Sequence, residues 1–363
     1  MAKKLMKGAE AIGEAAVRAG AQAYFCYPIT PQSEVAEYLA RRMPEVGGVF
    51  LQAESEVAAS QMIFGAATAG ARVFTTSSSP GISLMAEAMS YIAAAELPAV
   101  FVNVVRCGPG LGGILPSQGD YNQAAKSAGH GDYKLLVLAP STIQETVDHV
   151  KEAFTLADKY RNPVMVLADG LTGQMMEPVD FEGSELPPRP DHSSWTTTGC
   201  AGRQPHIVKT LFLDPDTLER RNFHARAKYD RMERDEVRVE SYHVDRPYEL
   251  VVVAYGTTAR VVKTAVDQLA EEGIDVALVR PITVYPFPNA EVYRRASAET
   301  VESVLVVEMN TGQMIDDVRA ALGRLDLPIH FYGRGGGNVP SPEEVVMKVK
   351  EILSRQRPGG GDA

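Results

Sequence analysis

Cysteine is scarce in this chain of 363 residues, where Cys26, Cys107 and Cys200 are the only three and lie far apart in sequence. A disulfide framework, a structural zinc site or an iron–sulfur cluster held by this chain alone would need more sulfur at closer spacing. The chain is therefore expected to carry no metal of its own.

Long apolar runs and an excess of basic charge are also missing. Apolar stretches such as "AVFVNVV" at 99–105 and "LVVVAY" at 250–255 are far shorter than the roughly 18 residues of a membrane span. Residues 1–20 have a short basic head without the apolar core of a signal peptide, so a cytoplasmic location with no membrane partner is expected. A net charge of −10 argues against nucleic-acid binding, which needs a basic face.

Common catalytic and nucleotide motifs are absent as well. The sequence contains no GxxxxGK[ST], HExxH or GxSxG pattern. "GPGLGG" at 108–113 fits GxGxxG after an apolar strand, but a nicotinamide site also needs a helix to start there, and Pro116 follows instead. We interpret this stretch as a loop whose glycines let the backbone pass close to a ligand or partner. A stand-alone NAD-dependent dehydrogenase is the alternative.

The pattern of hydrophobic residues predicts the fold class. Over residues 1–180, short β-branched runs such as "RVFTTSS" alternate with helix-like segments such as "ISLMAEAMSYIAAAE". This alternation is typical of an α/β fold with a parallel sheet covered by helices on both faces. The first helix is expected over residues 6–19.

The alternation stops near residue 180 and resumes at Tyr248, which predicts the domain organisation. Residues 1–180 form a first domain, and 248–355 form a second α/β domain. Residues 181–247 are interpreted as a connecting segment packed on the first domain, with a charged helix over 216–244. A contact surface for a partner is possible there, but a solvent-exposed helix is the simpler account. Residues 356–363 are expected to be a flexible tail.

Three loops lie at the carboxyl ends of successive predicted strands, over residues 27–34, 52–56 and 106–119. In a parallel sheet such ends form the ligand-binding rim. In the first loop, the two prolines of "YPITP" fix the backbone on either side of Thr30. Taken alone, Thr30 is a turn or helix-cap residue.

The second and third loops carry charge. Glu56, two residues after Glu54, starts an almost wholly apolar helix. Its carboxylate either stabilises the helix N-terminus or shares a proton with a bound heterocycle. Arg106 ends an apolar strand, and its guanidinium either binds a ligand carboxylate or forms a salt bridge with Glu87 or Glu96. The residues alone leave these alternatives open.

The same loops resemble a known family. "YPITPQSE" at 27–34, "QAESEVAA" at 52–59, "TTSSSPGISLM" at 75–85 and "NVVRCGPGLGGILPSQGDY" at 103–121 resemble the α subunit of 2-oxoacid:ferredoxin oxidoreductases. The resemblance covers nearly the whole chain. It is greatest for the branched-chain enzymes that act on 3-methyl-2-oxobutanoate, with the 2-oxoglutarate enzymes as the alternative. It implies oxidative decarboxylation of a 2-oxoacid, with acyl transfer to coenzyme A and electrons passed to ferredoxin.

The resemblance also implies a thiamine-diphosphate enzyme, with a pyrimidine-binding domain followed by a domain similar to the C-terminal domain of transketolase. The family's catalytic glutamate corresponds to Glu56, whose carboxylate binds the pyrimidine ring and promotes its imino form. Thr30 and Arg106 correspond to the residues that hold the substrate carboxylate. The residues expected to contact the cofactor are Pro28, Ile29, Glu56 and Ser79.

The resemblance implies partner subunits, because this chain lacks motifs that a complete enzyme of this kind needs. Thiamine-diphosphate enzymes anchor the diphosphate and Mg²⁺ with a GDG motif followed by asparagine, and "ADG" at 168–170 is the nearest match. The resemblance therefore implies a β subunit that binds the diphosphate, Mg²⁺ and an iron–sulfur cluster, a ferredoxin-like δ subunit and a separate γ subunit. A non-catalytic assembly subunit that keeps only the shape of the site is the remaining hypothesis.

Overall fold

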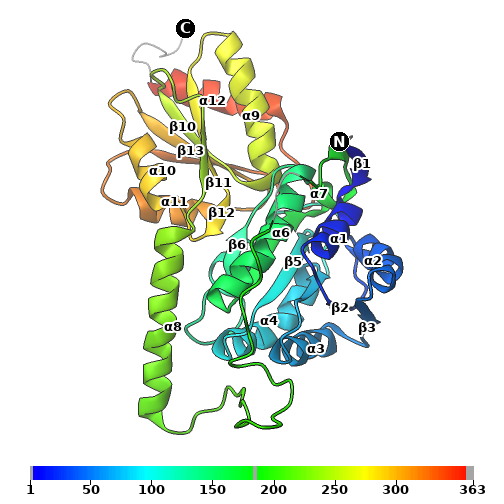
Figure 1. The fold of residues 1–363 in the computed structure, drawn as a ribbon. Coiled ribbons are helices and arrows are strands. Elements are labelled where there is room, and N and C mark those ends of the chain that lie inside the picture. The colour runs from blue at the N-terminus through cyan, green and yellow to red at the C-terminus, as the bar shows by residue number, and fades with distance from the viewer. Residues whose placement is uncertain (1–2, 183–185, 357–363) are drawn as a thin grey trace.

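The computed structural model describes residues 3–182 and 186–356, which form two α/β units joined by a long connection (Figure 1). The tail 356–363, predicted to be flexible, lies outside the described residues except for Gln356. Within these ranges, none of the helices combines the length and the apolar character that crossing a membrane requires.

The first unit is built on a seven-stranded sheet in the order β12-β6-β7-β5-β4-β2-β3. Neighbouring strands are parallel except for β12, which pairs antiparallel with β6. The central strand β5 is buried along its whole length, as expected for a parallel strand covered on both faces. The strands are β2 (Ala23–Cys26), β3 (Val49–Gln52), β4 (Val73–Ser77), β5 (Ala99–Val105), β6 (Leu136–Leu138), β7 (Pro163–Asp169) and β12 (Thr283–Tyr285).

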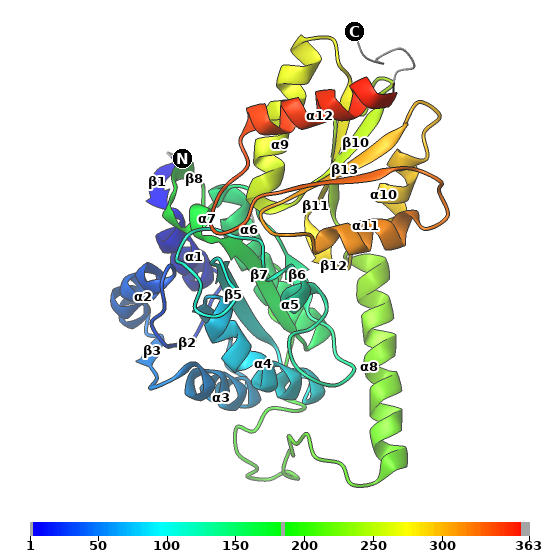
Figure 2. The ribbon, with the colours of Figure 1, turned by 180° about the vertical axis from the view of Figure 1, so that it is seen from behind.

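Helices cover both faces of this sheet. On one face α1, α2 and α6 pack together, and on the other α3 packs against α4 (Figures 1 and 2). The α/β class predicted from the sequence is therefore confirmed. The helices are α1 (Gly8–Arg18), α2 (Ser33–Glu45), α3 (Glu56–Thr68), α4 (Ser79–Ala94), α5 (Tyr121–Ala125), α6 (Ile143–Tyr160) and α7 (Gly170–Gln174).

The second unit contains a five-stranded sheet in the order β14-β13-β10-β11-β9. Helices α9 and α12 pack together on one side of it, and α10 packs against α11 on the other. Its elements are β9 (Val239–Tyr242), β10 (Leu250–Val253), α9 (Gly256–Glu271), β11 (Val276–Pro281), α10 (Asn289–Ala296), β13 (Ser303–Glu308), α11 (Met314–Leu322), β14 (Ile329–Gly333) and α12 (Pro342–Gln356).

The connection between the units runs first over the surface of the first unit. His192 Nε2 lies 3.0 Å from Asp158 Oδ1 of α6, and the backbone N–H of Thr197 donates to the carbonyl of Thr68 at the end of α3. The chain then enters α8 (Pro215–Asp235), a long helix that projects beside the first unit (Figure 1).

Two expectations about local structure are wrong. The helix expected over 6–19 begins only at Gly8, because residues 6 and 7 belong to strand β1 (Lys4–Lys7), which pairs antiparallel with β8 (Met176–Val179). The helix expected over 216–244 ends at Asp235, because β9 pairs with β11 of the second sheet. In both cases the partner strand is distant in sequence, so a local pattern does not reveal it.

Candidate active site

The first, second and third loops of the predicted rim all lie at one edge of the first sheet, because β2, β3, β4 and β5 run parallel. Gln32, which is fully buried, anchors the first loop to the sheet. Its amide donates to the carbonyl of Tyr27 at 3.3 Å and accepts from the hydroxyl of Thr76 at 2.5 Å. Thr30, two residues before Gln32, is exposed at the rim. Nothing in the sequence distinguished Gln32 from a surface glutamine.

Pro28 and Ile29 lie in the same turn, the first exposed and the second half-buried. Pro31 follows Thr30 through a cis peptide bond. A Cβ atom placed at Gly170, the first residue of α7, would lie 3.4 Å from Cγ of Pro31. The turn is therefore packed against the start of α7.

Of the two acids in the second loop, Glu54 is exposed and Glu56 is buried, with 5% of its surface accessible. Glu56 is the first residue of α3, and the cap residue Ser55 accepts a hydrogen bond from the backbone of Ala58. The carboxylate faces α4: a Cβ atom placed at Gly81 would lie 2.8 Å from its Oε1. The missing side chain of Gly81 makes room for it.

The hydroxyl of Ser77, at the end of β4, lies beside this carboxylate. The same hypothetical Cβ at Gly81 would lie 2.1 Å from Oγ of Ser77. Among the described residues, the hydroxyls of Thr75, Ser77 and Ser78 are buried without a hydrogen-bond partner. A buried hydroxyl left unpaired costs about 1–3 kcal/mol, so such a group marks a place where a bound molecule can complete the hydrogen bonds.

Arg106 joins the first and third loops. It is 8% exposed, and its Nη1 donates to the carbonyl of Thr30 at 3.0 Å. The hydroxyl of Ser79, the first residue of α4, lies 3.1 Å from both the backbone N and the backbone O of Arg106. The Nε of Arg106 is buried and has no partner among the described residues.

The salt bridge considered for Arg106 does not form in the described part of the chain. Glu96 instead lies 3.2 Å from His224 and 3.6 Å from Lys228, and Glu87 accepts from the hydroxyl of Tyr91. Among the described residues the guanidinium thus forms no salt bridge. Burial raises the pKa of the nearby carboxyl of Asp120, and the charge of Arg106 lowers it in part.

Residues 106–119, here called the arginine loop, contain the glycines of the GxGxxG match. Gly110 and Gly112 have φ angles of 69° and 54°, and a Cβ at Gly112 would lie 1.8 Å from the carbonyl oxygen of Cys107. No helix starts within this loop, so the structure lacks the helix N-terminus that a nicotinamide site requires. The loop instead exposes three large apolar side chains, Leu111, Ile114 and Leu115.

Asp169 of the "ADG" sequence is engaged by the protein itself. Its Oδ1 accepts hydrogen bonds from the backbone of Leu171 and Thr172, both at 3.0 Å. Burial raises the pKa of its carboxyl above the usual value, although these hydrogen bonds lower it in part. The side chain therefore serves as the cap of α7.

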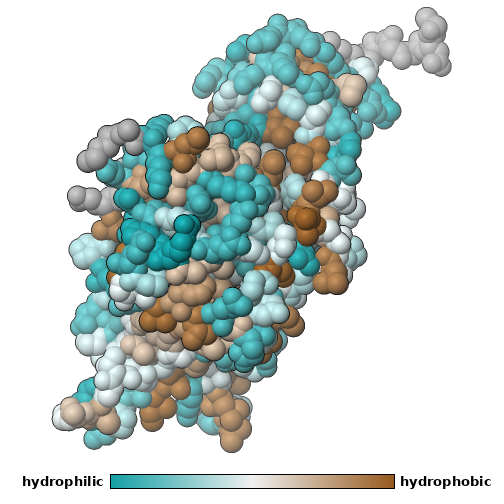
Figure 3. Space-filling model, turned by 90° about the vertical axis from the view of Figure 1, so that its right-hand side faces the viewer, coloured by the Kyte–Doolittle hydropathy of each residue, from teal (hydrophilic) through white to brown (hydrophobic). Residues whose placement is uncertain are grey.

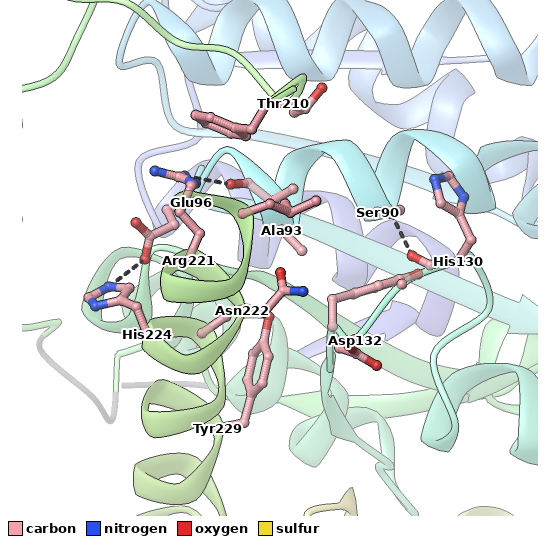
Figure 4. Close-up of a pocket in the computed structure, with 16 residues that line it drawn as sticks. Ser90, Ala93, Glu96, His130, Asp132, Thr210, Arg221, Asn222, His224 and Tyr229 are labelled. Atoms are coloured by element: carbon pink, nitrogen blue, oxygen red, sulfur yellow. Dashed lines mark hydrogen bonds and ion pairs between the residues drawn. The ribbon is translucent and has the colours of Figure 1, made fainter. Parts of the chain in front are cut away.

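A separate cavity of about 310 Å³ lies between α8 and the C-terminal half of α4 (Figure 4). Three of its lining side chains form contacts within the chain: Arg221 donates to the carbonyl of Ala94 at 3.0 Å, and His224 Nε2 lies 3.2 Å from Glu96 Oε1. Ser79 and Glu56 are not among its lining residues.

Exposed apolar side chains are frequent around the rim. Figure 3 shows hydrophobic surface on the face of the molecule that carries α2 and β3. The exposed large apolar residues of the first unit near the rim loops include Tyr27, Leu51, Val57, Leu84, Leu111, Ile114 and Leu115. Apolar surface of this kind is typical of a contact with another protein.

Comparison with known proteins identifies the family. Residues 14–242 match the model of the thiamine-diphosphate-binding domain of pyruvate flavodoxin/ferredoxin oxidoreductases. Residues 249–345 match the model of core domain II of pyruvate:ferredoxin oxidoreductase.

Individual relatives agree with these models. The chain is 49% identical to the ketoisovalerate oxidoreductase subunit VorB of Methanothermobacter thermautotrophicus, covering 97% of this chain and 98% of the relative. It is 37% identical to the 2-oxoglutarate synthase subunit KorA of Archaeoglobus fulgidus, covering 97% of this chain and 100% of the relative.

Solved structures show the same fold. A 2-oxoglutarate:ferredoxin oxidoreductase from Magnetococcus marinus, solved with 2-oxoglutarate, coenzyme A and succinyl-CoA, matches with a TM-score of 0.85 at 26% identity. That match covers 97% of this chain and 65% of the other chain. The resemblance of the rim loops is thus confirmed over the whole length of the sequence, and the chain belongs to the 2-oxoacid:ferredoxin oxidoreductase family.

Proposed function

We propose that this chain is the α subunit of a multisubunit 2-oxoacid:ferredoxin oxidoreductase. The enzyme converts a 2-oxoacid and coenzyme A to acyl-CoA and CO2, and passes the electron pair to ferredoxin. The observation that carries the proposal is a buried carboxylate, Glu56, beside the unpaired hydroxyl of Ser77 and at the same edge of the sheet as the guanidinium of Arg106. The relatives indicate the substrate class. The chain is 49% identical to a ketoisovalerate oxidoreductase subunit and 37% identical to a 2-oxoglutarate synthase subunit, which favours 3-methyl-2-oxobutanoate as the substrate. 2-Oxoglutarate is the second candidate.

The residues of this rim fit the pyrimidine end of thiamine diphosphate. The cofactor supplies, when bound, an electron sink for the pair released as CO2 leaves. Glu56 offers a buried carboxylate that can share a proton with a ring nitrogen. The unpaired hydroxyls of Ser77 and Ser78 would gain hydrogen-bond partners. Pro28 and Ile29 supply apolar surface from the turn, and Ser79 a hydroxyl at the start of α4.

Arg106 and Thr30 are proposed to hold the carboxylate of the substrate. A guanidinium is suited to bind a carboxylate through two parallel hydrogen bonds, and Nε of Arg106 is free to form one of them. The hydroxyl of Thr30 is exposed beside it, because Arg106 uses only the backbone carbonyl of that residue. These contacts orient the bond between the carboxylate and the keto carbon at the rim.

The rest of the active site is proposed to come from partner subunits. A β subunit supplies the diphosphate and Mg²⁺ site and an iron–sulfur cluster, and γ and δ subunits and ferredoxin complete the electron path. Apolar residues of the arginine loop support a protein contact at this rim. We further propose a cytoplasmic location and the domain limits 1–180, 181–247 and 248–355, although β9 joins the second sheet from within the connecting segment.

Activity of the assembled complex tests the proposal. The complex, with Glu56→Gln and Glu56→Ala variants beside the unchanged protein, is supplied with 2-oxoacids, coenzyme A and a low-potential dye as acceptor. We expect the Glu56→Gln variant to lose about 100- to 10,000-fold in rate, as for other acid–base groups, while complex assembly is retained. Undiminished oxidation in both variants would instead support a non-catalytic assembly subunit, and saturable NADH binding by the isolated chain would support a dehydrogenase.

A further inference from the structure

The C-terminal end of the arginine loop is hydrogen-bonded to the second unit by Ser117, Gln118 and Gly119, and the buried Gln118 forms most of these bonds. Gln118 is 4% exposed. Its Nε2 donates to the carbonyl of Tyr255 at 2.8 Å, and its Oε1 accepts from the hydroxyl of Thr258 at 2.8 Å and from the backbone of Met309 at 2.9 Å. Its backbone N–H donates to the carbonyl of Met309, and its carbonyl accepts from Asn310. Three hydrogen bonds of the side-chain amide thus go to residues of the second unit.

The residues after Gln118 connect this clamp to the rim. Asp120 Oδ2 accepts from the side-chain amide of Asn103 at 2.9 Å, and Asn103 Oδ1 accepts from the backbone of Ser79 at 3.2 Å. Ser79 in turn binds the backbone of Arg106 at 3.1 Å. A continuous series of hydrogen bonds therefore runs from the position next to the clamp to the arginine.

The arginine loop needs such anchors because of its composition. Four of its residues between Arg106 and Pro116 are glycines, which lose more conformational entropy on ordering than other residues. Its side chains Leu111, Ile114 and Leu115 are exposed and contribute little burial. Ser79 holds the start of the loop, and Gln118 holds its end.

We propose that Gln118 is a positioning residue through which the second unit fixes the arginine loop and, with it, the guanidinium that binds the 2-oxoacid carboxylate. The role in substrate binding rests on the proposed function, whereas the effect on the loop does not. The second unit then acts on the first step of the reaction without contacting the substrate.

Cysteine labelling of the full-length chain tests the effect on the loop. Cys107 lies in the loop and is 6% exposed, whereas Cys26 is fully buried in β2 and Cys200 is exposed in the connection. In Gln118→Ala we expect at least a tenfold faster reaction of Cys107 with a maleimide, with the rates of Cys26 and Cys200 unchanged. The matched control is Gln123→Ala, because the amide of Gln123 binds Ser83 of the same unit; its Cys107 should react at the wild-type rate.

Two outcomes of the labelling would overturn the clamp: an unchanged Cys107 rate in Gln118→Ala, or an equal increase in Gln123→Ala. Should Gln118→Ala fail to fold, Thr258→Val replaces it, since it removes one hydrogen bond to Gln118 Oε1 at nearly constant volume. For Thr258→Val we expect a smaller increase in the rate at which Cys107 reacts with the maleimide, and no change for Cys26 and Cys200.

Kinetics of the assembled complex test the effect on substrate binding. Gln118→Ala should raise KM for the 2-oxoacid about tenfold or more, while kcat and the KM for coenzyme A change little. The reason is that a misplaced arginine weakens binding of the substrate equally in the ground state and in the transition state. In an Arg106→Lys background the same change should have almost no further effect, because both act on one contact. A full independent effect in that background, or equal losses in kcat and in both KM values, would refute the positioning role. A wild-type complex that oxidises no 2-oxoacid would refute the proposed function, while the labelling result would still decide whether the clamp exists.

Discussion

The substitution Gly81→Ala tests the geometry of the candidate site with a single methyl group. A Cβ at this position would lie 2.1 Å from Oγ of Ser77, 2.8 Å from Oε1 of Glu56 and 3.0 Å from its Cγ. An ordinary contact begins at 3.4 Å, so the first two distances are too short by about 1.3 Å and 0.6 Å. The serine hydroxyl and the carboxylate must both move to admit the methyl group.

The effect on activity should exceed the effect on stability. Overpacking costs about 1–3 kcal/mol, but replacing glycine by alanine in a helix returns about 1 kcal/mol, so the net loss of stability is about 0–2 kcal/mol. A displacement of catalytic groups approaching 1 Å can cost about 100-fold in rate, which corresponds to about 2.7 kcal/mol in the activation barrier. We therefore expect kcat/KM for the 2-oxoacid to fall about 100-fold in Gly81→Ala.

The assay is steady-state oxidation by the assembled complex, together with thermal unfolding of the chain. The matched control is Gly65→Ala in α3, where an added Cβ meets nothing within 4 Å. That variant should keep full activity and gain about 0.5–1 kcal/mol in stability, because alanine loses less backbone entropy than glycine.

A Gly81→Ala complex with kcat/KM within threefold of the wild type would refute the reasoning, provided that Glu56→Ala abolishes activity in the same assay. Glu56 would then be required for activity, whereas its close contact with α4 at Gly81 would not be. Equal losses in Gly81→Ala and Gly65→Ala would point to a general response of the two helices instead of a displaced carboxylate.

Three further predictions follow from other contacts. Arg106→Lys should raise KM for the 2-oxoacid about tenfold or more with assembly intact, because an ammonium cannot form two parallel hydrogen bonds to a carboxylate; an unchanged KM would exclude the proposed contact. Gln32→Ala should lower the stability by about 1–3 kcal/mol, because the Thr76 hydroxyl loses its bond to Gln32 and keeps only Tyr24, and the Tyr27 carbonyl loses its donor; urea unfolding measures the loss against Gln123→Ala. Burial lowers the pKa of His149 from 6.5 to about 4, so as the pH falls through this range the unfolded chain takes up a proton and the native chain does not. The free energy of unfolding should therefore fall by about 2–3 kcal/mol between pH 7.5 and 4.5 from this residue alone, and the loss should be absent in His149→Leu.

The fold class could be predicted because its signal is local. Strands such as β5 read as short apolar runs bounded by helices, and a buried parallel sheet imposes that pattern on each strand. Pairings between distant segments gave no such signal. β1 pairs with a segment that begins at Met176. β12 lies in the second half of the sequence but pairs with β6 of the first sheet.

The candidate site could be predicted in part for the same reason. Parallel strands place their carboxyl ends at one edge, so Thr30, Glu56 and Arg106 could be grouped from the order of the loops alone. The supporting residues could not be found in this way. Gln32 and Gln118 are polar residues in loops, and only the tertiary structure shows that each is buried with its amide in hydrogen bonds.

Asp169 bears on the proposed division of the site between this chain and a partner. It stands at the end of β7, where an acid of the GDG type would be expected, but its Oδ1 is held by two backbone N–H groups of α7. Burial also raises the pKa of its carboxyl, which favours the neutral form, whereas Mg²⁺ binds ionised carboxylates. Freeing Asp169 for a metal would leave the N-terminus of α7 without its cap, close to the point where Gly170 meets Pro31 of the rigid turn. The end of β7 thus uses Asp169 to cap α7 and packs Gly170 against the turn that carries Thr30. Under the proposed function, a partner chain would therefore meet the charge of the diphosphate.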